Sequence, residues 1–143
     1  MNEERKGKTM ASIRMIEGIG EVYSAKLKQF GINTTQAMLE RANSAKDRKE
    51  VAEKTGISET LILEWVNLAD LFRIKGVGEE YSDLLEEAGV DTVPELARRD
   101  PENLYGKIVE VNQAKKLVRK LPTQVQVSSW IEQAKALPRI VTY

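Results

Sequence analysis

Apolar side chains recur at intervals of three and four residues over most of the chain, and no stretch alternates apolar and polar residues for long enough to predict a strand. This spacing predicts helices over residues 20–30, 35–42, 45–54, 59–72, 78–88, 93–99, 101–107, 110–120 and 128–137. The connections between them are short, which favours an all-α fold, a compact bundle of short helices. The polar residues 1–10 are expected to be a disordered lead-in.

Residues that cap helices stand at the predicted helix ends. Side chains that favour the N-cap position precede five of the helices, at Thr34, Ser44, Ser58, Thr92 and Asp100. Gly31, Gly56 and Gly89 each follow a helix and precede Ile or Val, which is the pattern of a left-handed C-cap with its hydrophobic contact. Local chemistry therefore supports the boundaries that the periodicity predicts.

The pattern of the first half recurs in the second half at a constant offset. Ile16-Glu17-Gly18-Ile19-Gly20 corresponds to Ile74-Lys75-Gly76-Val77-Gly78, and 9 of the 19 positions in residues 16–34 are identical to their partners. A gapless repeat with glycines at fixed positions indicates a duplicated unit. We therefore expect two units, about residues 13–73 and 74–140, within a single domain of residues 11–143.

A tryptophan-containing helix closes each unit. Trp65-Val66 and Ala69 correspond to Trp130-Ile131 and Ala134, and the longer distance in the second unit implies about seven extra residues there. We expect those residues around Pro122–Val127. We also expect the Trp130 helix to pack beside the first glycine motif and close a pseudo-two-fold domain, with both tryptophans in the core.

The apolar-x-Gly-apolar-Gly sequence at the start of a helix resembles the helix-hairpin-helix motif. Its two glycines permit a tight turn, and the exposed N–H groups of the following helix suit a phosphate oxygen. Proteins with this motif use paired hairpins to hold the DNA backbone without reading its sequence, so the resemblance implies that kind of contact. Gly18, Ile19 and Gly20 would form the phosphate site of the first motif.

The whole length from about residue 13 to residue 137 also resembles a prokaryotic family of tandem helix-hairpin-helix proteins classed as a domain of unknown function. The motifs that carry this resemblance include Lys54–Ser58, Trp65–Leu71, Arg73–Gly78 and Gly89–Val93. The resemblance implies the fold, and it brings no established activity.

Composition excludes several kinds of chemistry. The chain has no cysteine and no histidine, so disulfides, Cys/His zinc sites and nucleophiles activated by histidine are impossible. The acidic clusters Glu79-Glu80 and Glu86-Glu87 lack the ligand spacing of a known metal-binding loop, so we expect no enzymatic activity, no cofactor and no metal. The chain has neither an apolar signal segment nor a membrane-spanning run, which favours a cytoplasmic location.

Charge distinguishes the two glycine motifs. Glu79 and Glu80 follow the second motif, and residues 79–102 carry nine acidic and two basic side chains, a net of −7. Gly76, Val77 and Gly78 are therefore expected to be structural. The first motif is followed by Lys26 and Lys28, which could assist a phosphate contact.

A basic stretch forms the second candidate site. Residues 111–143 carry six basic side chains and one acidic side chain, a net of +5, and four of the basic residues are predicted on one helix: Lys115, Lys116, Arg119 and Lys120. This helix could assist nucleic-acid binding, neutralise the acidic second motif, bind an acidic partner, or simply be solvated.

Two functions follow from these observations. The first is weak binding to the backbone of DNA or another nucleic acid, without sequence preference, by a non-enzymatic module. The alternative is a protein–protein interaction or scaffolding module without nucleic-acid binding, which the zero net charge and the acidic second motif favour.

Overall fold

The computed structural model describes residues 11–143, and the regular structure in that range is helical apart from one isolated bridge between Ser12 and Thr34. The expected lead-in, residues 1–10, lies outside the described residues. The all-α prediction is therefore confirmed. None of the helices within residues 11–143 combines the length and the apolar character needed to cross a lipid bilayer.

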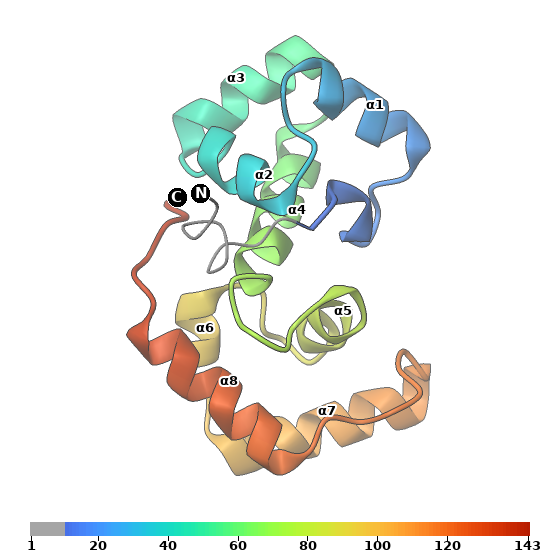
Figure 1. Cartoon of the computed structure of the whole chain (residues 1–143), viewed down its shortest axis with the longest axis vertical. Coiled ribbons are helices and arrows are strands. Elements are labelled where there is room, and N and C mark those ends of the chain that lie inside the picture. Colours follow the sequence, from blue (N-terminus) through green and yellow to red (C-terminus); the bar gives the residue numbers. More distant parts are fainter. Residues whose placement is uncertain (1–10) are drawn as a thin grey trace, which may run out of the picture.

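The described part of the chain contains one short 3₁₀-helix and eight α-helices. They are η2 (Ile13–Met15), α1 (Glu21–Gln29), α2 (Thr35–Arg41), α3 (Ala45–Thr55), α4 (Glu59–Leu71), α5 (Glu79–Glu87), α6 (Val93–Ala97), α7 (Pro101–Lys115) and α8 (Gln124–Ala136). Helices α1–α4 form the first unit and α5–α8 form the second. Figure 1 shows the units stacked along the long axis of the molecule, with α4 leading from the first to the second.

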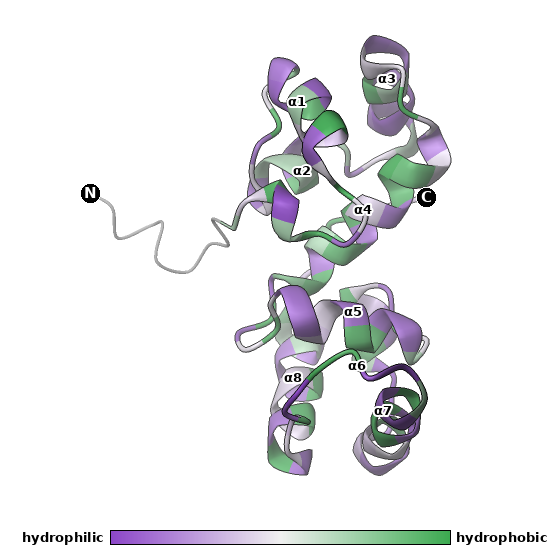
Figure 2. Ribbon diagram, turned by 90° about the vertical axis from the view of Figure 1, so that its right-hand side faces the viewer, coloured by the Kyte–Doolittle hydropathy of each residue, from purple (hydrophilic) through white to green (hydrophobic). Residues whose placement is uncertain are grey.

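Helix α4 is buried on several sides because it packs against α2 and α3 in the first unit and against α5 in the second. Seven of its 13 residues are buried, and Figure 2 shows apolar colour along much of this helix. A helix that packs on more than one side needs a wider apolar surface than a helix with one solvated face. The buried apolar residues of both units consequently form one continuous core.

The five predicted N-caps are all confirmed. The side chains of Thr34, Ser44, Ser58, Thr92 and Asp100 each accept a hydrogen bond from a backbone N–H in the first turn of the helix that follows. A sixth cap, Thr123, begins α8 and forms a reciprocal capping box with Gln126. The predicted start at residue 128 is therefore wrong, and α8 begins four residues earlier.

Two of the helix boundaries predicted between residues 101 and 120 differ from those of helix α7. Residues 101–115 form one helix rather than two, because Leu104, Ile108 and Val111 form a single buried stripe at helical spacing. The helix ends at Lys116, which has a φ of +52°. Asn112 then holds the next residues in place, since its side chain both accepts from Val118 N–H at 3.0 Å and donates to Val118 O at 3.2 Å.

The extra residues of the second unit lie upstream of the predicted position, Pro122–Val127. Helix α7 has 15 residues where α3 has 11, and the connection 116–123 is longer than the connection 56–58. Helix α6 is shorter than α2, with five residues against seven, which offsets part of this gain. Since Thr123 and Ser58 both cap the tryptophan helices, the two tryptophans still occupy the same position in α8 and α4.

Each tryptophan lies beneath the glycine turn of its own unit. A methyl group added at Gly18 would lie 3.3 Å from Trp65 Nε1, and one added at Gly76 would lie 2.9 Å from Trp130 Nε1. The tyrosine of the helix after each turn packs on the same ring, with centroids 5.1 Å apart in the first unit and 5.4 Å apart in the second. The expectation that Trp130 packs beside the first motif is therefore wrong, whereas the predicted core position of both rings is confirmed.

A buried ion pair joins the two units. Asp70 in α4 is buried, and its carboxylate accepts from Arg73 at 2.9 Å and from the backbone N–H of Val93 at 2.9 Å. Arg73 also donates to the carbonyl of Pro138 at 2.8 Å. One side chain pair thus connects the end of α4, the start of α6 and the segment after α8.

The C-terminal segment returns to the first unit. Val141 is buried, Thr142 N–H donates to Asn43 O at 2.8 Å, and Arg48 donates to Thr142 O at 2.7 Å. Figure 1 shows this segment running from α8 to the side of α2 and α3. The chain end therefore adds a second connection between the units.

The contact between tryptophan and glycine predicts a large cost for a methyl group at Gly76. We expect Gly76→Ala to lower the free energy of unfolding by about 2–4 kcal/mol, because its φ of +98° is strained for alanine and the methyl group would overlap Trp130. Gly56→Ala is the matched control, since its φ is +77° and no atom lies within 4 Å of the added methyl. Urea unfolding should show the smaller loss for Gly56→Ala, and equal losses would contradict the steric part of this account.

The buried ion pair predicts an unequal response to the loss of two carboxylates. Asp70→Ala should lower the free energy of unfolding by about 3–5 kcal/mol, because it leaves the Arg73 guanidinium and the Val93 N–H without their acceptor. Glu95→Ala removes an exposed pair with Arg98 at the same sequence spacing and should cost less than about 1 kcal/mol. Chemical denaturation of both variants measures the difference, and similar losses would refute the structural role of Asp70.

Candidate functional site

The first glycine turn is formed by Ile16–Gly20. Ile19 N–H donates to Ile16 O at 3.1 Å and closes a four-residue turn whose third residue, Gly18, has a φ of +94°. A positive φ at the third position is the geometry for which type II turns require glycine. Ile16 and Ile19 are buried while Gly18 and Gly20 are exposed, so the core holds the turn and solvent reaches its glycines.

The helix that follows this turn has an open N-terminus. Gly20 is the N-cap of α1 and offers no side-chain acceptor to the first-turn N–H groups. No atom lies within 4 Å of the position that a Gly20 side chain would occupy. Of the eight α-helices in the described part of the chain, only α1 and α5 lack a side-chain cap. The amides of these two helix starts therefore remain available to an outside acceptor.

The second glycine turn has the same backbone and different surroundings. Val77 N–H donates to Ile74 O at 3.1 Å, and Gly76 has a φ of +98°. Gln133 of α8 binds this turn, because it accepts from Lys75 N–H at 2.8 Å and donates to Lys75 O at 3.1 Å. The equivalent position in α4 is Leu68, which is buried, so only the second turn has this polar attachment.

The side chains that follow the two turns also differ. Glu79 and Glu80 occupy the first turn of α5, and both are exposed. In α1 the same positions hold Glu21 and Val22, and Val22 is 69% exposed. The helix after the second turn therefore has one more carboxylate in its first turn than the helix after the first turn has. Within the turns the order is reversed, because the exposed Glu17 of the first turn corresponds to the exposed Lys75 of the second turn.

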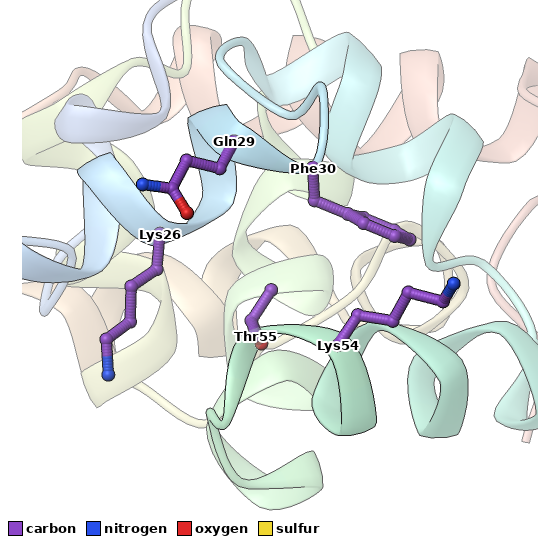
Figure 3. A pocket seen from close by; sticks show the side chains of 5 residues that line it. All are labelled: Lys26, Gln29, Phe30, Lys54 and Thr55. Atoms are coloured by element: carbon purple, nitrogen blue, oxygen red, sulfur yellow. The ribbon is translucent and has the colours of Figure 1, made fainter.

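Lys26 and Lys28 lie in the last turn of α1, and both are exposed. Lys26 also lines a pocket of about 250 Å³ between the ends of α1 and α3. Figure 3 shows Lys26, Gln29 and Phe30 extending from α1 and Lys54 and Thr55 from α3, with the two lysines on opposite sides. The sequence patterns did not indicate this pocket, because its residues come from two helices that are far apart in the chain.

The basic stretch does not form one helix face. Lys115 ends α7, Lys116 has a left-handed backbone, and Arg119 and Lys120 lie in the connection to α8. Lys115 donates to the carboxylate of Glu87 in α5, and this hydrogen bond raises the pKa of Lys115. This contact supports the interpretation that the basic stretch neutralises part of the acidic second unit.

An acidic face on α5 separates the basic stretch from the first glycine turn. Asp83, Glu86 and Glu87 bring carboxylate oxygens within 4.8 Å of one another, a spacing that could hold a cation. Their sequence positions i, i+3 and i+4 place them on one helix face, which was a signal available in the sequence. Figure 1 shows α5 between the first turn and α7, so the two candidate sites do not form one surface.

Burial and charge repulsion shift the pKa values on this face. Burial, and then the carboxylates of Glu64, Asp83, Glu87 and Asp91, raise the pKa of Glu86 to about 7. Burial is also the main cause that raises the pKa values of Asp83 and Asp91. The face is therefore short of compensating cations in the folded protein.

Residues 17–137 match the family described as "Domain of unknown function (DUF4332)", and the chain belongs to this family. No curated protein and no solved structure matches the chain. The resemblance noted in the sequence is thus confirmed at the level of a domain of unknown function. The helix-hairpin-helix assignment, the prokaryotic origin and the cytoplasmic location stay predictions.

The raised pKa of Glu86 predicts a pH-dependent stability. Its carboxyl group titrates near 4.5 when unfolded and near 7 when folded, so between these values the folded protein binds the extra proton. The free energy of unfolding should therefore fall as the pH rises from 4.5 to 7. Glu86→Gln should match the wild type in melting temperature at pH 4.5 and exceed it at pH 8. Glu110→Gln, an exposed control on α7, should show no such divergence, and parallel curves for Glu86→Gln would contradict the prediction.

Proposed function

We propose that this member of the family is a non-enzymatic helix-hairpin-helix module that binds the phosphate backbone of nucleic acid without sequence preference. The first glycine turn provides the contact, through the backbone N–H groups at the start of α1. Lys26 and Lys28 add positive charge on the same helix. Contacts of this kind position a protein on a nucleic acid and carry no sequence information.

One observation carries the proposal. The chain caps six of the eight helices in its described part with a Ser, Thr or Asp side chain and leaves open the two that follow Gly-x-Gly. An uncapped helix start combines N–H donors with the positive end of the helix dipole, which suits an anionic oxygen. The exposed position of Gly18 and Gly20 lets a phosphate approach the backbone closely.

The two turns contribute unequally to the proposed binding. The second turn is followed by Glu79 and Glu80, and it leads into α5, the helix that carries the acidic face. Phosphate is therefore repelled there. The helix after the first turn has a single carboxylate, Glu21, in its first turn, and Glu17 lies within the glycine turn itself. The expected binding is weak, because one turn and two lysines neutralise few phosphates.

A protein–protein interaction module is the second candidate function. The partly buried carboxylates on the acidic face of α5 favour it, since they could bind a basic partner surface, and Val22 adds an exposed apolar side chain beside the first turn. This candidate predicts no affinity for DNA even at low salt. A binding measurement with DNA therefore separates the two functions.

The proposal predicts that an acidic N-cap at Gly20 weakens binding without harming the fold. Gly20→Asp should weaken binding to a short labelled DNA duplex by about tenfold, because the new carboxylate occupies the first-turn amides of α1 and repels phosphate. The backbone at Gly20 is extended, with φ −89° and ψ −164°, which an N-cap Asp adopts readily. Thermal stability should stay equal or rise slightly, since Asp is at least as good an N-cap as Gly.

Gly78→Asp is the matched control at the second turn, where the backbone is also extended and space is also open. It should leave DNA affinity nearly unchanged. Fluorescence anisotropy at several salt concentrations gives a second measure, because Gly20→Asp should reduce the slope of log affinity against log salt by about 1. Undetectable binding at low salt, or equal effects of the two substitutions, would refute the proposal.

A further inference from the structure

The pocket between the ends of α1 and α3 has the composition of a nucleotide site. Its five lining residues include two lysines, an amide side chain, a hydroxyl and an aromatic ring. Within residues 11–143 neither Lys26 nor Lys54 forms an ion pair, although Glu50 precedes Lys54 by one helical turn. Two unpaired ammonium groups beside a pocket attract an anion.

Phe30 makes the pocket more specific than a basic surface. It is the C-cap of α1, it is partly buried, and its ring lines the pocket. The guanidinium of Arg41 lies 4.4 Å from the ring centroid but does not line the pocket. The ring therefore packs against a cation and also contributes to the lining of the pocket, where an aromatic ligand can contact it.

The pocket also lies at the far end of the helix that begins at the first glycine turn. Ten residues separate Gly20 from Phe30, which corresponds to about 15 Å along α1. Phosphates of one B-form strand are about 3.4 Å apart along the axis, so this distance spans about four nucleotides. A strand that contacts the first turn can consequently reach the pocket.

We infer that this pocket binds one unpaired nucleotide of single-stranded nucleic acid, with the base against Phe30 and the phosphates that flank the nucleotide near Lys26 on one side and Lys54 on the other (Figure 3). The volume of about 250 Å³ suits a group of the size of a single base. Stacking on an aromatic ring tolerates every base, which agrees with binding that lacks sequence preference. This inference rests on the proposed function for the path of the strand, and the pocket itself is tested separately.

The test measures the affinity of the full chain for labelled oligothymidine and for a DNA duplex by fluorescence anisotropy. Phe30→Leu should weaken oligothymidine binding by about tenfold, since a stacking contact is lost. Lys54→Gln should weaken it severalfold, and both variants should leave duplex affinity within about twofold. Lys46→Gln, on the exposed first turn of the same helix α3, is the control and should change neither affinity.

A second measurement uses the wild-type protein, so it does not depend on whether Phe30→Leu folds well. Oligothymidine should shift the ring-proton NMR resonances of Phe30 upfield, as stacking requires. The chain has two phenylalanines, and the buried Phe72 provides an internal reference that should not move. An unshifted Phe30 resonance at saturating oligothymidine would overturn the inference.

Three further outcomes would contradict the inference that the pocket binds a nucleotide of single-stranded nucleic acid. Unchanged oligothymidine affinity in both Phe30→Leu and Lys54→Gln overturns it. Displacement by thymidine monophosphate at the same concentration as the oligonucleotide would mean that the pocket takes free nucleotides, and equal displacement by oligoglutamate would mean that it takes acidic peptides. Failure of the proposed function looks different, because Gly20→Asp would then leave duplex binding unchanged while the pocket variants still weaken oligothymidine binding.

Discussion

The structure depends on the contact between an indole ring and a glycine with positive φ. In each unit the tryptophan of the closing helix lies directly beneath the third residue of the glycine turn, where even a methyl group would come within 3.3 Å of Nε1. The left-handed backbone and the close approach of the ring both require glycine at this position. Within the described residues, the buried Trp65 Nε1 has no hydrogen-bond acceptor. The ring is therefore kept for its shape and its apolar area rather than for a polar contact.

This contact fixes the backbone of the two turns and leaves their outer surfaces free to differ. Both turns close with the same hydrogen bond and start an uncapped helix. The second turn has Gln133 behind it, Lys75 within it and two glutamates after it, whereas the first turn has Glu17 within it and one glutamate and an exposed valine after it. Duplication has thus preserved the packing, and the electrostatics of the two copies have diverged. Equal backbones consequently do not imply equal ligands.

Features that depend on neighbours in the chain could be predicted from the sequence, and features that depend on distant partners could not. The N-caps at Thr34, Ser44, Ser58, Thr92 and Asp100 are local, and each was predicted correctly. The unbroken α7 is not local, because the core contact of Ile108 overrides the weak helix propensity around it. For the same reason the sequence did not reveal that each tryptophan packs on its own turn.

In the candidate site, too, features set by neighbouring residues could be predicted and features set by distant residues could not. The glycines of the first turn were found from their spacing, and the shared face of Asp83, Glu86 and Glu87 could have been found from theirs. The pocket could not, because Phe30 and Lys54 are 24 positions apart and meet only when α1 and α3 pack together. The sequence alone also did not show that the basic stretch lies away from the first turn. Lys115 is attracted to Glu87, and no pattern within α7 specifies that partner.

Helix stability does not account for the open start of α1. An aspartate in place of Gly20 would cap the helix in the same extended backbone, and six other helices in the described chain carry such a cap. Turn geometry does not account for it either, since the φ at Gly20 is −89° and no atom fills the place of its side chain. Glycine at this position gives up a stabilising cap and leaves room beside the helix amides. That combination is what an anion needs in order to reach the backbone, and it is the physical reason for proposing a phosphate contact at this helix start.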